Sequence, residues 1–428
     1  MSSENVLKKE HRVYSVEFWR FMFTVIVALY HLEIYYQHKL MPSGTSAVEF
    51  FFVVAGFTIA MSAARRLEAG GASGLSTRES HSLAVDYAKK KLLAIYPLLV
   101  ATLVITLLII PMFNALTAVQ MPGFKSPTIW EVFLQRIKVI TSSEWEWLMM
   151  VGTPPGFNNM TSVSTPIVPL WFLTHLIVIG YLYTFLVSRK YALMKFAAPL
   201  IAILGFIYFT LNSENPLDFY IKMGLFNAGS VKAIYEMAMG MSIYQLYVYL
   251  RKREWKLFGR IVMQLLELFA IYRFCALTFG AQQGIDNFRR IPYILIIVLF
   301  SFSNVTWFSK LLNRKFMGKL GKLSLTMYLI HFPVAGIYYM GIMMEKMKPT
   351  AFKLPRLFQE TGGLTLRWKP IPLTWGDVIL YIPFVIVVSL FINMIVFGIR
   401  GGYRVHKRRK LELAEAMKEQ LRSESEQE

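Results

Sequence analysis

Long apolar stretches, separated by short polar segments, run through most of the chain. Most of them approach the ~20 apolar residues that a helix needs to cross the hydrocarbon core of a bilayer. We therefore predict an all-α fold, a polytopic membrane bundle of about ten transmembrane helices. The predicted spans are approximately Val16–Tyr36, Ala47–Ala64, Leu92–Ile110, Ile167–Val187, Phe196–Leu211, Ser230–Leu250, Ile261–Gly280, Pro292–Phe308, Leu323–Met344 and Val378–Ile399.

The composition agrees with this pattern. Hydrophobic residues make up 55% of the chain and charged residues 17%, whereas about 25% of a typical soluble domain is charged. These values exclude a disordered chain, a coiled coil and an ordinary soluble enzyme. Since Cys275 is the single cysteine, the chain can form neither an intramolecular disulfide nor a cysteine-based metal site.

The formal net charge is +20, and the positions of the basic residues explain it. About 30 of the 46 lysines and arginines fall on the same side of the predicted spans as the N-terminus, and about 13 fall on the other side. Because cytoplasmic segments of membrane proteins are rich in lysine and arginine, we expect both termini in the cytoplasm and no nucleic-acid partner. The basic strip Arg404–Lys410 is expected to meet anionic lipid headgroups.

The chain is expected to have three parts: a cytoplasmic N-terminus at 1–15, a transmembrane domain at 16–399 and a charged cytoplasmic tail at 400–428. The Gly- and Ser-rich stretch Ala69–Ser82 is typical of a flexible inner linker. Within the long outer segment Pro111–Pro166, the part Pro127–Met150 is predicted to include a helix at the membrane interface. Aromatic residues there favour an interfacial belt over a sugar-binding platform.

Ionisable side chains inside a membrane are costly, so those in the predicted spans are candidates for function. The first span contains Glu17, Arg20 and His31. Arg20 and His31 are eleven residues apart, which is three helical turns plus about 20° and a rise of about 16 Å, so both face the same way. Glu17 lies one turn before Arg20 and can pair with it. An ion pair at the inner interface would explain Glu17 and Arg20 as well as a functional role does, but it would not explain His31.

The other ionisable span residues have simple structural explanations. Glu49 can be an interfacial carboxylate, and Lys232 and Glu236 are four residues apart and can neutralise each other. Glu267 and Arg273 can do the same only through a neighbouring helix. No HExxH, GxSxG, P-loop or GxGxxG motif is present, which removes the commonest soluble chemistries. Two further span histidines are His175 and His331.

The first span resembles the opening signature of the acyltransferase 3 family. In that signature an acid precedes an arginine by three residues, and a histidine follows the arginine eleven residues later, as Glu17, Arg20 and His31 do here. Four later segments resemble further motifs of the family, in the expected order. These segments are Glu49–Phe57, Tyr96-Pro97, Pro169–Leu173 and Gly321–Pro333.

The chain departs from the family pattern at three places. Ala55 occupies the serine position of the second-span motif, and Leu176 stands where many members carry a glutamate. Lys91 and Ala94 occupy the positions of two arginines that often precede the third span. Phosphate binding at that point would therefore depend on Lys91 or on the neighbouring lysines.

The resemblance implies a membrane acyltransferase that moves an acyl group, expected to be acetyl, from cytoplasmic acyl-CoA to a hydroxyl of a carbohydrate. The acceptor would be a cell-surface or exported glycan, and the protein a multi-pass component of a bacterial cell membrane. Its partners would be the lipid bilayer, acyl-CoA, the carbohydrate acceptor and polysaccharide-synthesis proteins. Acyl-CoA (acetyl-CoA) is a co-substrate here, and neither a bound cofactor nor a metal is expected.

Acyl transfer from a thioester to a hydroxyl needs a base, donors that stabilise an oxyanion, and a way for the donor to reach the acceptor. His31 is the natural base, Arg20 would orient the donor or set the field around His31, and Glu17 would hold Arg20. These three are the expected catalytic residues. The residues expected to bind substrate or donor are Lys89, Lys90, Lys91, Glu49, Trp171 and His331, with Arg65 and Arg66 near the same phosphates.

Two non-enzymatic alternatives remain from the sequence alone. A helical bundle with buried charge pairs also fits a proton-coupled transporter or flippase, although the chain lacks paired, Gly- or Pro-interrupted spans in corresponding halves. An export subunit of a polysaccharide pathway would have no chemistry of its own. Acyl-CoA hydrolysis or acceptor acetylation by the purified protein would separate the enzyme from both alternatives.

The charge asymmetry generates a prediction about topology. Labels or reporter fusions at Ser73 and Lys353 should report opposite sides of the membrane, because the first lies in a predicted inner segment and the second in the last outer segment. A result that places both sites on one side would contradict the ten-span topology and the cytoplasmic position of the basic segments.

Overall fold

This computed structural model describes residues 13–32, 41–44, 47–68, 74–106, 128–139, 170–213, 221–280, 288–346 and 374–398. Nearly all of these residues are helical, and the exception is a small antiparallel hairpin of β1 (Lys222–Met223) and β2 (Phe226–Asn227). The helices are α1 (Tyr14–Leu32), α2 (Ala47–Glu68), α3 (Thr77–Val104), α5 (Ile129–Val139), α7 (Leu170–Arg189), α8 (Tyr191–Asn212), α9 (Ala228–Lys252), α10 (Leu257–Phe279), α11 (Ile291–Ser303), α12 (Trp307–Leu312), α13 (Lys315–Lys346) and a final helix, Trp375–Gly398.

Among the described residues, 7 helices are long and apolar enough to cross a membrane. They confirm an all-α membrane protein, and each overlaps one of the predicted spans. The helices α3, α9 and α11 also overlap predicted spans, but they are too polar or too short to qualify by length and hydropathy. The total of ten spans and the side on which the termini lie therefore stay predictions. The qualifying segments are Tyr14–Leu32, Ala47–Glu68, Leu170–Arg189, Met194–Asn212, Leu257–Phe279, Lys315–Tyr339 and Trp375–Gly398.

The predicted eighth span, Pro292–Phe308, is not one continuous helix. The α-helix ends at Ser303, because the φ of 54° at its C-cap, Asn304, is left-handed and cannot continue an α-helix. The chain then starts the short α12, whose N-cap is Thr306. At 13 residues, α11 is about 20 Å long, which is shorter than the ~30 Å hydrocarbon core.

The predicted inner linker is also shorter than expected. Its last residues belong to α3, which begins at Thr77 rather than after Ser82. The local reason is a capping box: the Ser76 hydroxyl accepts from the Glu79 backbone N–H, and the Glu79 carboxylate accepts from the Ser76 backbone N–H. Gly and Ser content alone did not distinguish a linker from a helix start.

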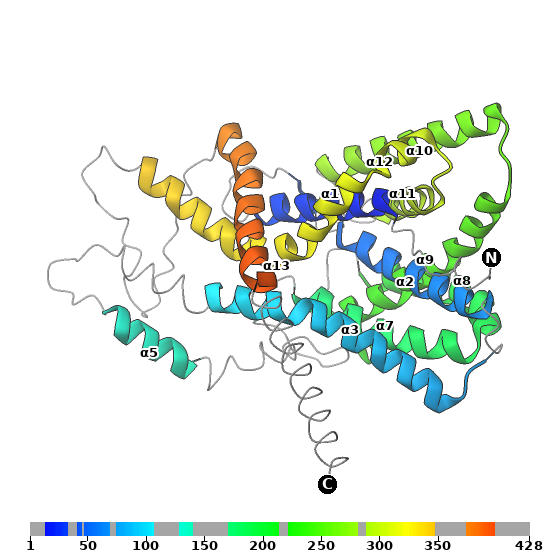
Figure 1. The fold of residues 1–428 in the computed structure, drawn as a ribbon, viewed down its shortest axis with the longest axis horizontal. Helices are drawn as coiled ribbons and strands as arrows, with labels where there is room; N and C mark the ends of the chain where they lie inside the picture. The colour runs from blue at the N-terminus through cyan, green and yellow to red at the C-terminus, as the bar shows by residue number, and fades with distance from the viewer. Residues whose placement is uncertain are drawn as a thin grey trace, which may run out of the picture.

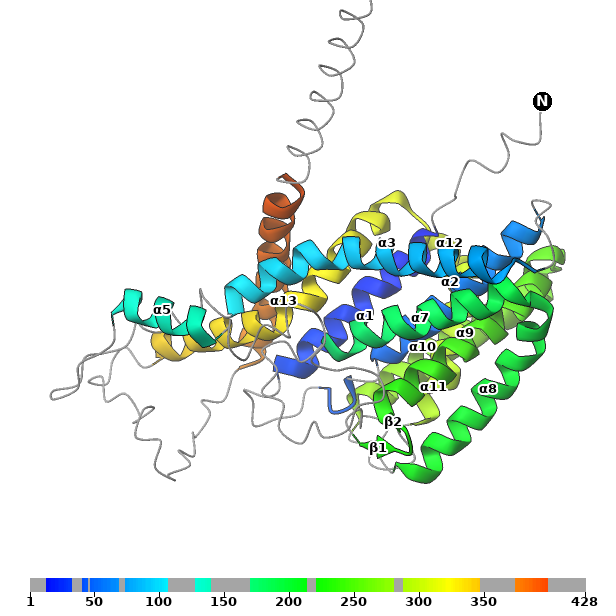
Figure 2. The ribbon, with the colours of Figure 1, turned by 90° about the horizontal axis from the view of Figure 1, so that it is seen from below.

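The bundle has a buried centre and an apolar periphery. In α2, 72% of the most apolar segment is buried, against 22% in α8 and 28% in the final helix. Figure 1 and Figure 2 show α8 and the final helix at the edges of the bundle. Their outward-facing side chains are mostly large and apolar, as expected for surfaces that contact lipid rather than water.

The central helices α2 and α9 pack backbone against backbone. A Cβ atom at Gly56 would collide with the Met237 backbone, and one at Gly240 would collide with the Val53 carbonyl oxygen. Small residues at helix crossings allow close approach where lipid offers no hydrophobic driving force. This contact holds α2, and the residues that it carries, at a fixed distance from α9.

Replacing Gly240 with alanine should therefore force α2 and α9 apart. We expect Gly240→Ala to lower the melting temperature of the detergent-solubilised protein, because overpacking of this kind costs about 1–3 kcal/mol. Gly398→Ala is the matched control, since no atom lies within 4 Å of a Cβ at that position. Equal melting temperatures for the two variants would contradict the close packing of α2 on α9.

Candidate active site

Helices α1 and α13 pack in parallel along most of α1 and bring polar residues together at three levels. At the first level the Glu17 carboxylate occupies the space that a side chain at Gly321 would need. At the second, the hydroxyls of Thr24 and Ser324 are 2.7 Å apart. At the third, His31 meets a histidine of α13. Glu17, Thr24 and His31 are seven residues apart, a spacing that keeps one face of a helix against a parallel neighbour.

The third level is a hydrogen-bonded histidine pair. His31 Nδ1 lies 2.9 Å from the Val27 carbonyl oxygen and 3.1 Å from His331 Nε2. His331 Nδ1 lies 3.1 Å from the Met327 carbonyl oxygen, and the Tyr381 hydroxyl donates to the His331 carbonyl oxygen. A neutral ring nitrogen that faces a carbonyl oxygen must carry the hydrogen, so the hydrogen-bond network assigns the Nδ1–H tautomer to both rings.

This assignment has a chemical consequence. His331 Nε2 is an acceptor, and the Nδ1–H of His31 is shared between His331 and the Val27 carbonyl oxygen. The lone pair of His31 therefore lies on Nε2, where it can take a proton. The positive charge that would form on His31 is stabilised by the two acceptors that its Nδ1–H already faces.

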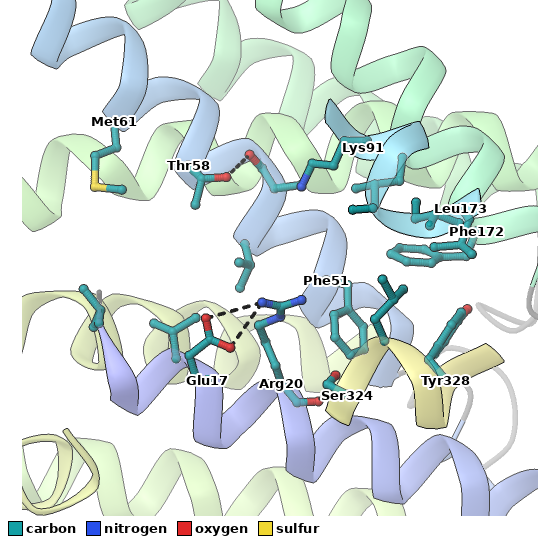
Figure 3. A pocket seen from close by; sticks show the side chains of 18 of the residues that line it. Glu17, Arg20, Phe51, Thr58, Met61, Lys91, Phe172, Leu173, Ser324 and Tyr328 are labelled. Atoms are coloured by element: carbon teal, nitrogen blue, oxygen red, sulfur yellow. Dashed lines mark hydrogen bonds and ion pairs between the residues drawn. The ribbon is translucent and has the colours of Figure 1, made fainter. Parts of the chain in front are cut away.

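A cavity of about 570 Å³ lies beside the first and second levels of the α1–α13 contact. Residues of α1, α2, α3, α7, α11 and α13 line it. Figure 3 shows Glu17 and Arg20 towards one end of this cavity and Phe51, Phe172 and Tyr328 towards the other. One end is therefore charged and the other aromatic.

The charged part of the cavity has more cations than anions. Arg20 Nη1 lies 3.3 Å and 3.5 Å from the two carboxylate oxygens of Glu17. Arg65 of α2 and Lys91 of α3 line the same cavity, and Figure 3 shows Lys91 approaching from the side opposite Arg20. Among the residues lining the cavity, three cations thus face one carboxylate, so the lining favours an anionic ligand.

The remaining predicted donor-binding residues lie elsewhere. Lys89 and Lys90 are exposed and do not line the cavity, unlike their neighbour Lys91. Trp171 packs against Phe52, while the next residue, Phe172, lines the cavity instead. The fourth-span motif therefore contributes to the cavity through Phe172, and not through the tryptophan that was expected from the sequence.

Glu49 is buried in a separate charge cluster between α2 and α9. Its carboxylate lies 3.0 Å from Lys232 Nζ, and Glu236 lies 3.8 Å from the same nitrogen. The predicted pairing of Lys232 with Glu236 is thus present, but the closer partner is Glu49. Since Glu49 does not line the cavity, its position favours an ion pair that joins two helices over donor binding.

The structure also shows the surroundings of two further ionisable span residues, Glu267 and His175. The buried carboxylate of Glu267 accepts from the Ser309 hydroxyl, and no ion pair between Glu267 and Arg273 is present among the described residues. His175 Nε2 lies 3.0 Å from the Ser230 hydroxyl, so this histidine is held within the bundle. Neither residue lines the cavity.

The structure adds residues to which the sequence analysis gave no role at the site, although Phe51, Ser324 and Tyr328 lie in the motif segments Glu49–Phe57 and Gly321–Pro333. Thr24 and Ser324 form the middle level of the α1–α13 contact, and Phe51 and Tyr328 line the cavity. The seven-residue spacing of Glu17, Thr24 and His31 could have identified the first of these. Within the described residues, no group of three His, Cys, Asp or Glu side chains is arranged to hold a metal ion.

The fold and the site are those of a polytopic helical bundle with a cation-lined cavity and a buried pair of histidines. The sequence comparison identifies the class of protein: the model of the acyltransferase domain (acyltransferase 3) matches residues 13–397. The chain belongs to this family and is a membrane acyltransferase. That activity is the one expected from the sequence, rather than transport or export. Searches of curated proteins and of solved structures returned no match.

Proposed function

We propose that this acyltransferase moves an acetyl group from acetyl-CoA in the cytoplasm to a hydroxyl of a cell-surface or exported carbohydrate. The cationic cavity carries the proposal. Its lining includes Val13, just before α1, and Arg65 near the end of α2. Both helix ends adjoin basic segments that the positive-inside pattern assigns to the cytoplasm. Acyl-CoA is a polyanion with an apolar acyl end, which suits a cavity that is cationic at one end and aromatic at the other.

Arg20 and His31 would act on different parts of the donor. They are separated by about 16 Å along α1, so they cannot contact the same reacting atoms. Arg20, together with Lys91 and Arg65, would hold the phosphates or the amide-containing arm of the donor. Glu17 would position Arg20, because its two oxygens face the Arg20 guanidinium.

His31 would be the general base. Its Nε2 takes the proton of the acceptor hydroxyl while the hydroxyl oxygen attacks the thioester carbonyl carbon. The tetrahedral intermediate then collapses, the carbon–sulfur bond breaks, and the proton passes to the departing thiolate of CoA. His331 would be a positioning residue, since its Nε2 accepts from the Nδ1–H of His31 and favours the protonated form of that ring.

The proposed orientation also supports the proposed acceptor and cellular setting. A donor held near the cytoplasmic side and a base about halfway through the bilayer would leave the outer side for the acceptor. We propose a multi-pass protein of a bacterial cell membrane, with ten spans, cytoplasmic termini and polysaccharide-synthesis proteins as partners. In this proposal acyl-CoA is consumed as a co-substrate, and the reaction as written needs no bound cofactor or metal.

Loss of the proposed base should abolish acyl transfer without lowering the amount of protein in the membrane. We expect His31→Ala to reach the membrane at a normal level and to lose about 10²–10⁴-fold in rate, which is the typical contribution of general-base catalysis. The measurement is a comparison, by mass, of surface glycans from cells with the wild-type protein, without the protein, and with the variant.

His81→Ala is the matched control. His81 is an exposed histidine of α3 that is hydrogen-bonded to Tyr181 and lies outside the cavity lining. Normal glycan acetylation with His31→Ala at normal abundance would contradict the mechanism. Identical glycans with and without the protein would contradict the proposed acceptor.

The two neighbouring lysines provide a matched test of the donor site. Lys91→Gln should weaken acetyl-CoA binding by about 10-fold or more and reduce its salt dependence, because a charge-assisted contact in the cavity is lost. Lys89→Gln should bind acetyl-CoA as the wild type does, because Lys89 is exposed outside the cavity. Equal affinities for the two variants would show that Lys91 contributes only to topology.

A further inference from the structure

Three aromatic rings from three different helices meet at one end of the cavity. Phe51 of α2 lies 5.8 Å from Phe172 of α7 and 6.0 Å from Tyr328 of α13, between ring centroids. The Phe172 and Tyr328 rings are 5.5 Å apart. All three residues line the cavity, and Figure 3 shows them together beyond Arg20. We refer to Phe51, Phe172 and Tyr328 as the aromatic triad.

The aromatic triad separates the cavity from the histidine pair. Neither His31 nor His331 lines the cavity. The Tyr328 ring lies 6.0 Å from the His331 ring, one helical turn further along α13, and the His331 ring lies 4.9 Å from that of His31. In the proposed function, a thioester that enters at the charged end passes the aromatic triad before it reaches His31 Nε2.

The described side chains beside the histidine pair are buried. His31 is 7% exposed and His331 is fully buried, and the ring of Phe332 lies 5.8 Å from that of His31. The neighbouring side chains of Leu32 and Leu329 are fully buried as well. An apolar chain that reaches the histidines would have to displace packed atoms, and the displacement grows with each methylene group.

From these contacts we infer that the aromatic triad is a steric filter that restricts the donor to short-chain acyl-CoA thioesters. The inference rests on the proposed function, because it assumes that the thioester passes from the cationic end of the cavity to His31. Acetyl is small enough to pass between rings after a modest side-chain rotation. A hexanoyl chain would have to separate helices α2, α7 and α13. Discrimination of about 10–200-fold per methylene group is typical of a tight apolar pocket.

The test measures chain-length preference in the purified full-length protein. The rate of CoA release from acetyl-CoA, butyryl-CoA and hexanoyl-CoA is measured with water as acceptor, because the natural acceptor is not needed for this reaction. We expect the wild type to favour acetyl-CoA over butyryl-CoA by at least about 10-fold, and over hexanoyl-CoA by more than that. Phe51→Ala and Phe172→Leu should each raise the hexanoyl-to-acetyl ratio by about 10-fold or more.

A control distinguishes the filter from a general loss of packing. Phe258→Ala removes a ring that is 78% exposed on α10, outside the cavity, and should keep the wild-type ratio. If Phe51→Ala does not fold, Phe51→Leu provides a smaller change at the same position. The readout is the ratio of the two rates, which a uniform loss of active protein leaves unchanged.

The outcomes separate the filter from the proposed function. A hexanoyl-to-acetyl ratio that stays at the wild-type value in all triad variants, while CoA is still released, would overturn the filter alone. A wild type that releases CoA from hexanoyl-CoA as fast as from acetyl-CoA would do the same. If no thioester releases CoA or raises the melting temperature of the wild type, the proposed donor is wrong and the filter is overturned with it.

Discussion

The parallel contact between α1 and α13 is the constraint on which the site depends. In apolar surroundings each polar side chain needs a partner, because an unsatisfied group there costs several kcal/mol. Two levels of this contact supply such partners, Ser324 for Thr24 and His331 for His31, and the other level supplies the space at Gly321 that the Glu17 carboxylate occupies. A shift of α13 by one residue would rotate its face by about 100° and remove all three together.

The same contact arranges the chemistry along one axis. The charged residues lie at one end of α1, the histidine pair lies about three turns further along, and the aromatic triad lies between them. In the proposed function, an elongated substrate is held at its charged end while its reactive end is oriented at His31. Orientation of this kind replaces an unfavourable encounter in solution with a nearly unimolecular reaction.

Not every buried charge in the bundle belongs to this axis. Glu49, Lys232 and Glu236 form a compact cluster between α2 and α9, where the two backbones also approach closely. Removing one member of such a pair leaves an uncompensated charge, so the cluster contributes mainly by fixing how these helices meet. An intramembrane charge is thus a candidate for function, but its partner decides which role it has.

The sequence alone was sufficient for the class of fold and for the most local features of the site. A span can be recognised from hydropathy alone as a run of about 20 apolar residues. The predicted spans overlap each of the helices that, among the described residues, are long and apolar enough to cross a membrane. The pairing of Glu17 with Arg20 was equally accessible, because residues three apart on one helix are neighbours whatever surrounds them.

Only the tertiary structure could decide which residues from different helices meet. It shows that His331 is hydrogen-bonded to His31 and that Glu49 pairs with Lys232. It also shows that Lys91 is the one of three adjacent lysines that lines the cavity, and that Phe172 lines it instead of Trp171. The physical reason is that side chains on different helices are brought together by the rotation and crossing of those helices. Packing of the whole bundle sets both quantities, and no periodicity within one segment contains them.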